Sequence, residues 1–160
     1  MKPTLLSEKD NLNGIWFFGL AGSGKTFASK VCAKFIRRPF IIDGDDVREF
    51  ISFDLGYSSS DRIIQVTRVL GILEIARKNY QFPIASTVTM TEAVFQKCNL
   101  LGVEVVEIIR PMAQLHKVRD IYEKSQNVVG KQIPQIEIEA KRLLNNGDKE
   151  FEEKLEAFIK

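Results

Sequence analysis

The sequence predicts an α/β fold, in which a parallel sheet of about five strands carries helices on both faces. Short apolar runs alternate with longer segments whose apolar residues recur every three or four positions, the spacing of a helix face. A helix-sized segment separates each apolar run from the next, so the runs cannot pair as hairpins and must pair in parallel. The length of 160 residues and the 44% hydrophobic content suit one domain over residues 1–160.

The first half of the chain begins this alternation. Residues 15–18 are an apolar run that stops at a glycine, and residues 25–35 then space their apolar side chains as a helix does. A second apolar run, residues 40–42, ends at an acidic turn and is followed by a short segment of helical spacing. The polar residues 58–61 offer oxygen atoms that can cap a long helix, which continues to about Tyr80.

The second half repeats the same pattern. Apolar runs again mark the strands. Pro111 indicates where one helix begins, because proline suits the first turn of a helix. Along the chain we expect a strand over 82–86, a helix over 91–99, a strand over 103–109, a helix from Pro111 to about Tyr122, a loop over 125–134, a strand over 142–144 and a closing helix over 148–160.

The composition excludes several classes of protein. The 23 Lys and Arg nearly balance the 21 Asp and Glu, so nothing in the charge calls for nucleic acid or a membrane as partner. Cys32 and Cys98 lie far apart and His116 is the only histidine, which disfavours zinc or disulfide frameworks and suits a reducing compartment. Residues 1–13 are polar and no apolar run is long enough to span a membrane. We therefore expect a soluble cytoplasmic protein with an N-terminal extension over residues 1–13.

A glycine-rich segment, which we call the phosphate loop (residues 19–26), follows the first strand candidate. It reads Gly-Leu-Ala-Gly-Ser-Gly-Lys-Thr and matches GxxxxGK[ST], the Walker A pattern, in the strand–loop–helix context that this pattern requires. Its backbone N–H groups can converge on phosphate oxygens, Lys25 can reach the β- and γ-phosphates, and the Thr26 hydroxyl can join a magnesium shell. The pattern predicts a P-loop NTPase-type sheet, with a glycine-rich turn that binds nothing as the alternative. The residues expected at ATP are Gly19, Ala21, Gly22, Ser23, Gly24, Lys25 and Thr26.

Three carboxylates follow the second strand candidate, at the sheet edge where ligands of α/β proteins bind. They are Asp43, Asp45 and Asp46. A carboxylate there can accept the proton of an attacking hydroxyl or hold a magnesium-bound water. For Asp43 the catalytic interpretation leads, whereas Asp46 is favoured as the N-cap of the next helix.

Four segments between Ile15 and about Ser86 together form a further pattern. They are the phosphate loop, residues 42–48 (Ile-Asp-Gly-Asp-Asp-Val-Arg), residues 54–58 (Asp-Leu-Gly-Tyr-Ser) and the pair Asp61-Arg62. In this series the chain resembles the adenylylsulfate (APS) kinases, P-loop enzymes that move the γ-phosphoryl group of ATP to the 3′-hydroxyl of adenylylsulfate. The resemblance implies an ATP-dependent kinase that uses Mg²⁺ and acts on a small-molecule nucleotide.

The resemblance also implies roles for single side chains. Asp43 falls on the family's base, which lies on the metal side and contacts the metal through water. Gln65 stands where the family has Asn, one helical turn after Arg62, so both can face one pocket. Tyr57 falls on the aromatic residue near the substrate's base, and Thr89 stands where a serine hydroxyl is usual. The substrate-binding residues implied so far are Asp45, Arg48, Tyr57, Arg62, Gln65 and Thr89.

Beyond residue 89 the sequence departs from the family. Met90 stands where the family has proline, and the lid region, approximately residues 119–134, is shorter than the family's. Arg119 is the first residue of this lid, and the resemblance implies that it contacts ATP. Val128 is a substrate-binding position at which the family has an aromatic residue that stacks on adenine. Losing this stacking would weaken binding of the base by about 1–3 kcal/mol. Two alternatives stay open: a kinase for a cytidine nucleotide phosphoramidate in surface-polysaccharide biosynthesis, and a nucleotide-binding module without transfer activity.

Arginines are the candidate residues for binding the anionic groups of the acceptor and of ATP. Arg48 and Arg62 are favoured, Arg119 follows, and Arg68 is a weaker candidate because charged helix residues usually face solvent. Arg110 ends the fourth strand at the edge of the expected site and has no role assigned. The sequence does not fix the oligomeric state, and a homodimer is the assembly to be considered.

Overall fold

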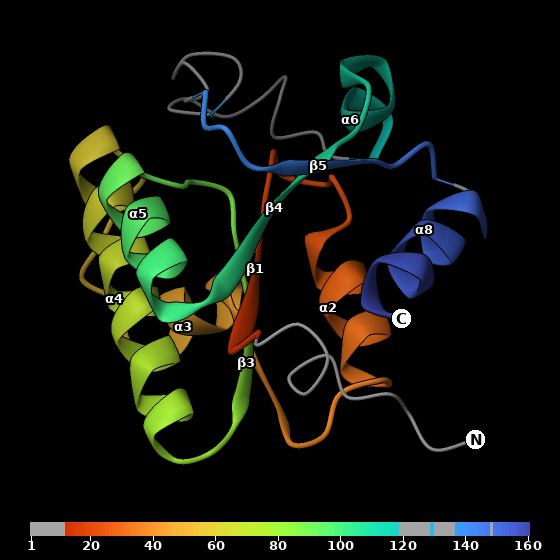
Figure 1. Cartoon of the computed structure of the whole chain (residues 1–160). Helices are drawn as coiled ribbons and strands as arrows, with labels where there is room; N and C mark the ends of the chain where they lie inside the picture. The colour runs from red at the N-terminus through yellow and green to blue at the C-terminus, as the bar shows by residue number, and fades with distance from the viewer. Residues whose placement is uncertain (1–11, 119–128, 130–136, 148) are drawn as a thin grey trace.

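A computed structural model describes residues 12–118, 129, 137–147 and 149–160. Its centre is a five-stranded sheet with the order β2-β3-β1-β4-β5, in which every neighbouring pair is parallel (Figure 1). The predicted α/β fold with a parallel sheet is therefore confirmed. The strands are β1 (Gly14–Phe18), β2 (Pro39–Asp43), β3 (Phe82–Thr87), β4 (Val103–Ile109) and β5 (Lys141–Leu144).

Helices cover both faces of the sheet, as Figure 1 shows. One face carries α2 and α8, and the other carries α3, α4 and α5. The short helix α6 follows β4. The helix bounds are α2 (Lys25–Ala33), α3 (Gly44–Phe50), α4 (Ser59–Lys78), α5 (Glu92–Leu101), α6 (Met112–Val118) and α8 (Lys149–Ile159).

The central strand β1 supplies side chains to both cores. Ile15 and Phe17 pack with α2 and α8, whereas Trp16 and Phe18 pack with α3, α4 and α5. All four side chains are buried, the most exposed of them at 2%. Successive side chains of a strand point to opposite faces, so a strand covered on both faces must be apolar throughout. This explains the uninterrupted apolar run that predicted β1 from sequence.

Side chains cap three of the helices. Ser58 and Thr91 cap α4 and α5, in agreement with the expected start of the long helix near residue 58. Helix α3 is capped by Asp43, whose Oδ1 accepts a hydrogen bond from the Asp45 N–H at 2.9 Å. The interpretation of Asp46 as this cap is wrong, because Asp43 stands directly before the helix in an extended conformation and Asp46 lies inside it.

Some sequence-based expectations fall on residues outside the described ranges. They concern residues 1–11 of the N-terminal extension, Arg119, Val128, the end of the helix near Tyr122 and most of the lid region. Leu12 and Asn13, the last residues of the extension, are described: Leu12 packs against the core, and the Asn13 N–H donates to the Gly102 carbonyl at 2.8 Å. In the part of the chain that the structure describes, none of the helices has the length and apolar character needed to cross a membrane.

Candidate active site

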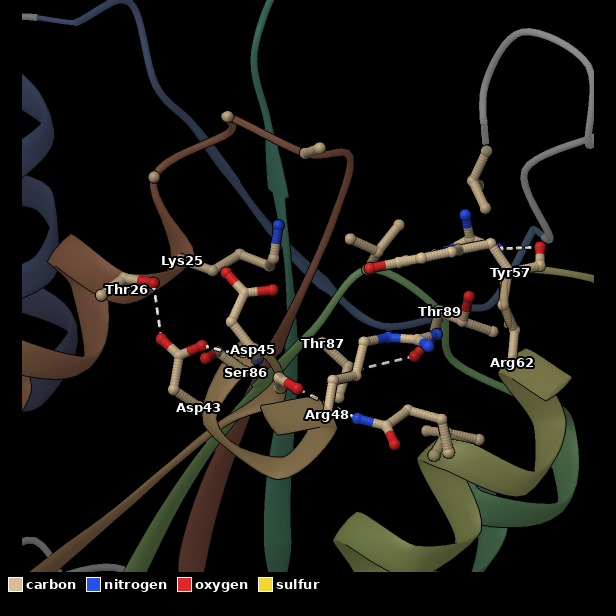
Figure 2. Close-up of a pocket in the computed structure, with 18 of the residues that line it drawn as sticks. Lys25, Thr26, Asp43, Asp45, Arg48, Tyr57, Arg62, Ser86, Thr87 and Thr89 are labelled. Carbon is tan, nitrogen blue, oxygen red and sulfur yellow. Dashed lines mark hydrogen bonds between the residues drawn. The ribbon is translucent and has the colours of Figure 1, made fainter. Parts of the chain in front are cut away.

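The loop after β1 and the carboxyl ends of β2 and β3 border a cavity of about 550 Å³. In Figure 2 the phosphate-loop side chains Lys25 and Thr26 lie at one end of it, and Tyr57 and Arg62 lie at the other. The lining residues are Ala21, Gly22, Gly24, Lys25, Thr26, Phe27, Asp43, Gly44, Asp45, Arg48, Tyr57, Arg62, Gln65, Val66, Ser86, Thr87, Val88, Thr89 and Val129.

The phosphate loop connects β1 to α2 at one end of this cavity. Gly22 and Gly24 have φ angles of 84° and 105°, in the left-handed region that side chains with a Cβ rarely adopt. Helix α2 begins at Lys25 without a side-chain cap, and the dipole of the helix favours an anion at this end. The Lys25 Nζ donates to the Leu20 carbonyl at 2.9 Å, across the loop. The loop therefore has the backbone geometry and charge of a phosphate site.

Asp43 contacts the phosphate loop directly. The Thr26 hydroxyl donates to Asp43 Oδ2 at 2.7 Å, while Oδ1 of the same carboxylate caps α3 (Figure 2). Strand pairing explains this contact, because β2 and β1 both lie beside β3 and end at the same edge of the sheet. The structure thus brings together the two oxygen groups that the sequence placed on the metal side.

Two arginines and a tyrosine form the opposite end of the cavity. The Arg48 Nη1 donates to the Gly56 carbonyl at 2.8 Å, and the Arg62 Nε donates to the Tyr57 carbonyl at 3.1 Å. Both guanidinium groups lie over the Tyr57 ring, at 4.2 Å and 5.4 Å from its centre. Burial, and then the positive charge of Arg48, lower the pKa of Arg62. An anionic ligand would offset the repulsion between these two positive charges.

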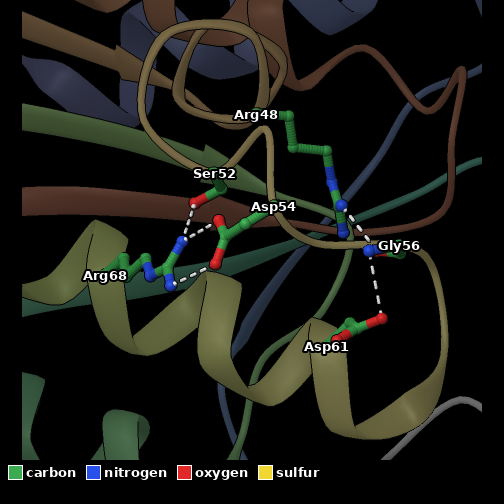
Figure 3. A network of polar contacts seen from close by, with 6 residues as sticks. All are labelled: Arg48, Ser52, Asp54, Gly56, Asp61 and Arg68. Carbon is green, nitrogen blue, oxygen red and sulfur yellow. Dashed lines mark hydrogen bonds and ion pairs between the residues drawn. The ribbon is translucent and has the colours of Figure 1, made fainter.

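The segment that carries Tyr57 is held in place from α3 and α4 (Figure 3). Arg68 on α4 makes two hydrogen bonds to Asp54, at 2.6 Å and 2.9 Å, and a third at 3.3 Å to the Ser52 hydroxyl. The bond from Arg68 holds the pKa of Asp54 below its usual value. Asp61 accepts from the Gly56 N–H at 3.0 Å. Arg68, the weaker anion candidate, therefore supports this segment and is not among the cavity-lining residues.

We expect Arg68→Met to raise the KM for the acceptor severalfold and to leave the KM for ATP unchanged. The variant removes the bidentate contact to Asp54, so the segment carrying Tyr57 samples more conformations before the acceptor binds. Steady-state kinetics with each substrate varied in turn provide the measurement. A KM for ATP that rises as much as that for the acceptor would contradict this assignment.

The floor of the cavity contains polar atoms that lack a partner within the described residues. Gln65 is 5% exposed and its Nε2 donates to the Gly44 carbonyl at 3.0 Å, which leaves Oε1 buried without a donor. The Thr89 hydroxyl is likewise buried without a hydrogen bond. Neighbouring Thr87 is satisfied, since it accepts from the Trp16 Nε1 at 2.8 Å and donates to the Thr89 carbonyl at 2.7 Å. Buried polar groups are normally paired, so a bound ligand or water is expected at Gln65 and Thr89.

The structure brings most of the predicted site residues to the cavity, but not Gly19 or Ser23. Ser23 is fully buried, and its N–H donates to the Leu20 carbonyl within the loop at 3.0 Å. Sequence reasoning did not single out Phe27 or Val66, which also line the cavity. An aromatic directly after GK[ST] was a usable signal for Phe27, whereas Val66 is one apolar position among several on α4.

A glycine-rich loop that enters a helix beside a carboxylate of a nearby parallel strand is the arrangement of a P-loop phosphotransferase. Comparison with known proteins gives the family. The family model described as adenylylsulphate kinase matches residues 12–139. The chain belongs to the adenylylsulphate kinase family and is a phosphotransferase that acts on a hydroxyl group.

Curated relatives and solved structures agree with this family. A probable adenylyl-sulfate kinase of Bacillus subtilis (strain 168) is 26% identical over 76% of this chain and 68% of its own length. An adenylyl-sulfate kinase of Clostridium kluyveri is 29% identical over 79% of this chain and 67% of its own length. The Mycobacterium tuberculosis APS kinase CysC, solved with AMPPNP and APS, aligns with a TM-score of 0.78 at 20% identity, over 92% of this chain and 96% of that one. This structural likeness shows a shared fold.

Proposed function

We propose that this chain transfers the γ-phosphoryl group of ATP to the 3′-hydroxyl of a nucleotide-like acceptor. The observation that carries the proposal is the 2.7 Å contact between Thr26 and Asp43, which joins the phosphate loop to a carboxylate within the cavity. The same cavity extends to Arg48 and Arg62, so one space offers a donor site, a base and an acceptor site. Family membership supports this reaction, because the family uses ATP.

In this proposal the phosphate loop holds the phosphates of ATP. Lys25 leaves the Leu20 carbonyl and neutralises charge on the β- and γ-phosphates, where charge is redistributed in the transition state. The N-terminus of α2 adds backbone N–H groups on the same side. Arg119, from the sequence-based expectation, would close over ATP, and its position lies outside the described residues.

Mg²⁺ fits the oxygen groups at this edge of the sheet. Thr26 and Asp43 offer a hydroxyl and a carboxylate, which are hard ligands of the kind that Mg²⁺ prefers, and Asp43 would contact it through water. The described residues contain no group of three or more His, Cys, Asp or Glu that could hold a metal alone, so phosphate oxygens and water would complete the shell. When bound, Mg²⁺ would neutralise phosphate charge during transfer.

Asp43 is the proposed base for the acceptor hydroxyl. Its carboxylate is fixed at both oxygens, by the Thr26 hydroxyl and by the Asp45 N–H, and therefore has a defined orientation in the cavity. A carboxylate so placed can orient an attacking hydroxyl and accept its proton as the bond to phosphorus forms. Positioning supplies much of the rate in phosphoryl transfer, so this fixed orientation is as important as basicity.

The acceptor is proposed to be an anionic nucleotide, with adenylylsulfate as the leading candidate. Arg48 and Arg62 would hold its charged group, and Tyr57 would lie at its base. The unpaired Gln65 Oε1 and Thr89 hydroxyl would accept or donate hydrogen bonds at the floor of the cavity. Val128 lies outside the described residues, and a cytidine nucleotide phosphoramidate remains the second candidate.

We expect Arg62→Ala to raise the KM for every anionic acceptor about tenfold or more, whatever its base. The reason is that a charge-assisted contact depends on the charge of the acceptor and not on the identity of its base. The KM for ATP should stay within about twofold. Arg77→Ala is a matched control, since Arg77 belongs to the same helix α4 but does not line the cavity. Kinetics with adenosine and cytidine acceptors provide the measurement, and a loss confined to one base would contradict the assignment.

A module that binds nucleotide without transfer is the alternative function. The shortened lid favours it, whereas the Thr26–Asp43 contact favours transfer, because a binding module needs no base beside its phosphate loop. Formation of ADP that depends on a nucleotide acceptor separates the two. The cytoplasmic location stays a prediction, and the homodimer stays one possible assembly, which analytical ultracentrifugation tests.

A further inference from the structure

The phosphate loop is held from outside the cavity by side chains at the ends of β4 and β5. Asn145, directly after β5, donates from Nδ2 to the Ser23 carbonyl at 2.7 Å. Arg110, directly after β4, donates from Nη1 to the Gly22 carbonyl at 3.0 Å. Neither residue lines the cavity described above.

Asn145 is itself held on three sides. Its N–H donates to the Ile109 carbonyl at 2.7 Å, and its Oδ1 accepts from the Gly147 N–H at 2.7 Å. The residue is 4% exposed, and a Cβ added to Gly24 would come within 2.6 Å of Nδ2. With Oδ1 bound to an N–H, Nδ2 is left to donate to the Ser23 carbonyl, so the amide is fixed in one orientation.

Planar peptide bonds connect these outer contacts to the inside of the loop. In a trans peptide the C=O of one residue and the N–H of the next point in opposite directions. Holding the Ser23 carbonyl toward Asn145 therefore turns the N–H of Gly24, a cavity-lining residue, the other way. Without Asn145 this carbonyl could rotate toward the phosphates, where its negative end would repel them.

We propose that Asn145, assisted by Arg110, is a positioning residue that sets the phosphate loop for nucleotide binding. The inference rests on the proposed function, because it assumes that the loop binds ATP. It adds to that function two residues that reach the loop from distant parts of the chain, 122 positions away for Asn145 and 88 for Arg110. Preorganised N–H groups bind an anion more tightly than groups that must first reorient.

The test compares Asn145→Asp with Asn146→Asp. Both variants add one negative charge, at adjacent positions, but only Asn145 contacts the loop, and Asn146 is exposed. Aspartate at position 145 keeps the oxygen that accepts from Gly147 and replaces the donor that faces the Ser23 carbonyl. We expect Asn145→Asp to weaken binding of Mg-ATP about tenfold or more by calorimetry, and Asn146→Asp to stay within about twofold of wild type.

Two further measurements separate positioning from stability. Ile159→Ala, in the buried core of α8, should lower Tm without changing the Kd for Mg-ATP of the folded protein. In Asn145→Asp the KM for ATP should rise while the KM for the acceptor stays unchanged. If that variant does not fold, Arg110→Met should still weaken Mg-ATP binding severalfold relative to Arg142→Met, which removes the same charge from β5.

Equal Kd values for Asn145→Asp and Asn146→Asp would overturn the inference, as would equal values for the two arginine variants. A loss of affinity in Ile159→Ala as large as in Asn145→Asp would also overturn it. A wild-type protein that binds no Mg-ATP would instead overturn the proposed function.

Discussion

Lys25→Ala should lower turnover by about 10²- to 10³-fold while the fold stays intact. Lys25 lies at the start of α2 and donates across the loop to the Leu20 carbonyl, so its ammonium group is already directed over the phosphate loop. Removing it takes away the only lysine of the loop at the point where the transferring group carries most negative charge. The side chain is only partly buried, so its loss leaves no large core cavity.

Circular dichroism and steady-state rates on the same sample test this expectation. Lys30→Ala is the matched control, because Lys30 is an exposed residue of the same helix α2. We expect its rate to stay within about twofold of wild type. Activity of Lys25→Ala within about twofold of wild type would remove the assignment of the phosphate loop.

Asp43→Asn should retain ATP binding and lose transfer by about 10²- to 10⁴-fold. Asparagine keeps the size of the side chain and is as good a helix N-cap as aspartate, so α3 should still begin at the same residue. In wild type the Thr26 hydroxyl donates to the carboxylate of Asp43. In the variant the amide nitrogen can donate to the Thr26 hydroxyl instead, which preserves the contact with the direction reversed. What is lost is the negative charge and the basicity that the acceptor hydroxyl needs.

Calorimetry with Mg-ATP and an assay of transfer measure the two halves of this prediction. Asp46→Asn is the control, because Asp46 is an exposed carboxylate of the same segment that does not line the cavity. Transfer that survives in Asp43→Asn would mean that Asp43 is a structural cap and that the base lies elsewhere. Loss of Mg-ATP binding would contradict this prediction and would assign Asp43 mainly to the metal side of the site.

The sheet and the phosphate loop could be predicted because their causes are local in sequence. β1 is covered on both faces, so it is apolar throughout, and the buried strand β3 is apolar over its first four residues, so both stand out as runs. The approach of Asp43 to the phosphate loop also followed from a general rule, since parallel strands end at one edge of the sheet.

The contacts that depend on distant packing could not be predicted. Arg68 on a helix and Asp54 in a loop could each have faced solvent, and only the packing of α4 beside that loop pairs them. Arg110 had no role assigned, although it directly follows β4 at the edge where the site lies. Asn145 follows the short strand β5 in the same way, so the rule that drew attention to Asp43 could have indicated its position, but not its contact with the Ser23 carbonyl.

The measurement that most directly tests the central claim is phosphorus NMR of a reaction with Mg-ATP and a nucleotide acceptor, adenylylsulfate and a cytidine phosphoramidate in turn. The account predicts ADP together with a new phosphomonoester on the acceptor's 3′-oxygen, formed by the wild type and abolished in Asp43→Asn. ATP that binds but yields neither ADP nor a phosphorylated product with any nucleotide acceptor would contradict it, and would favour a binding module.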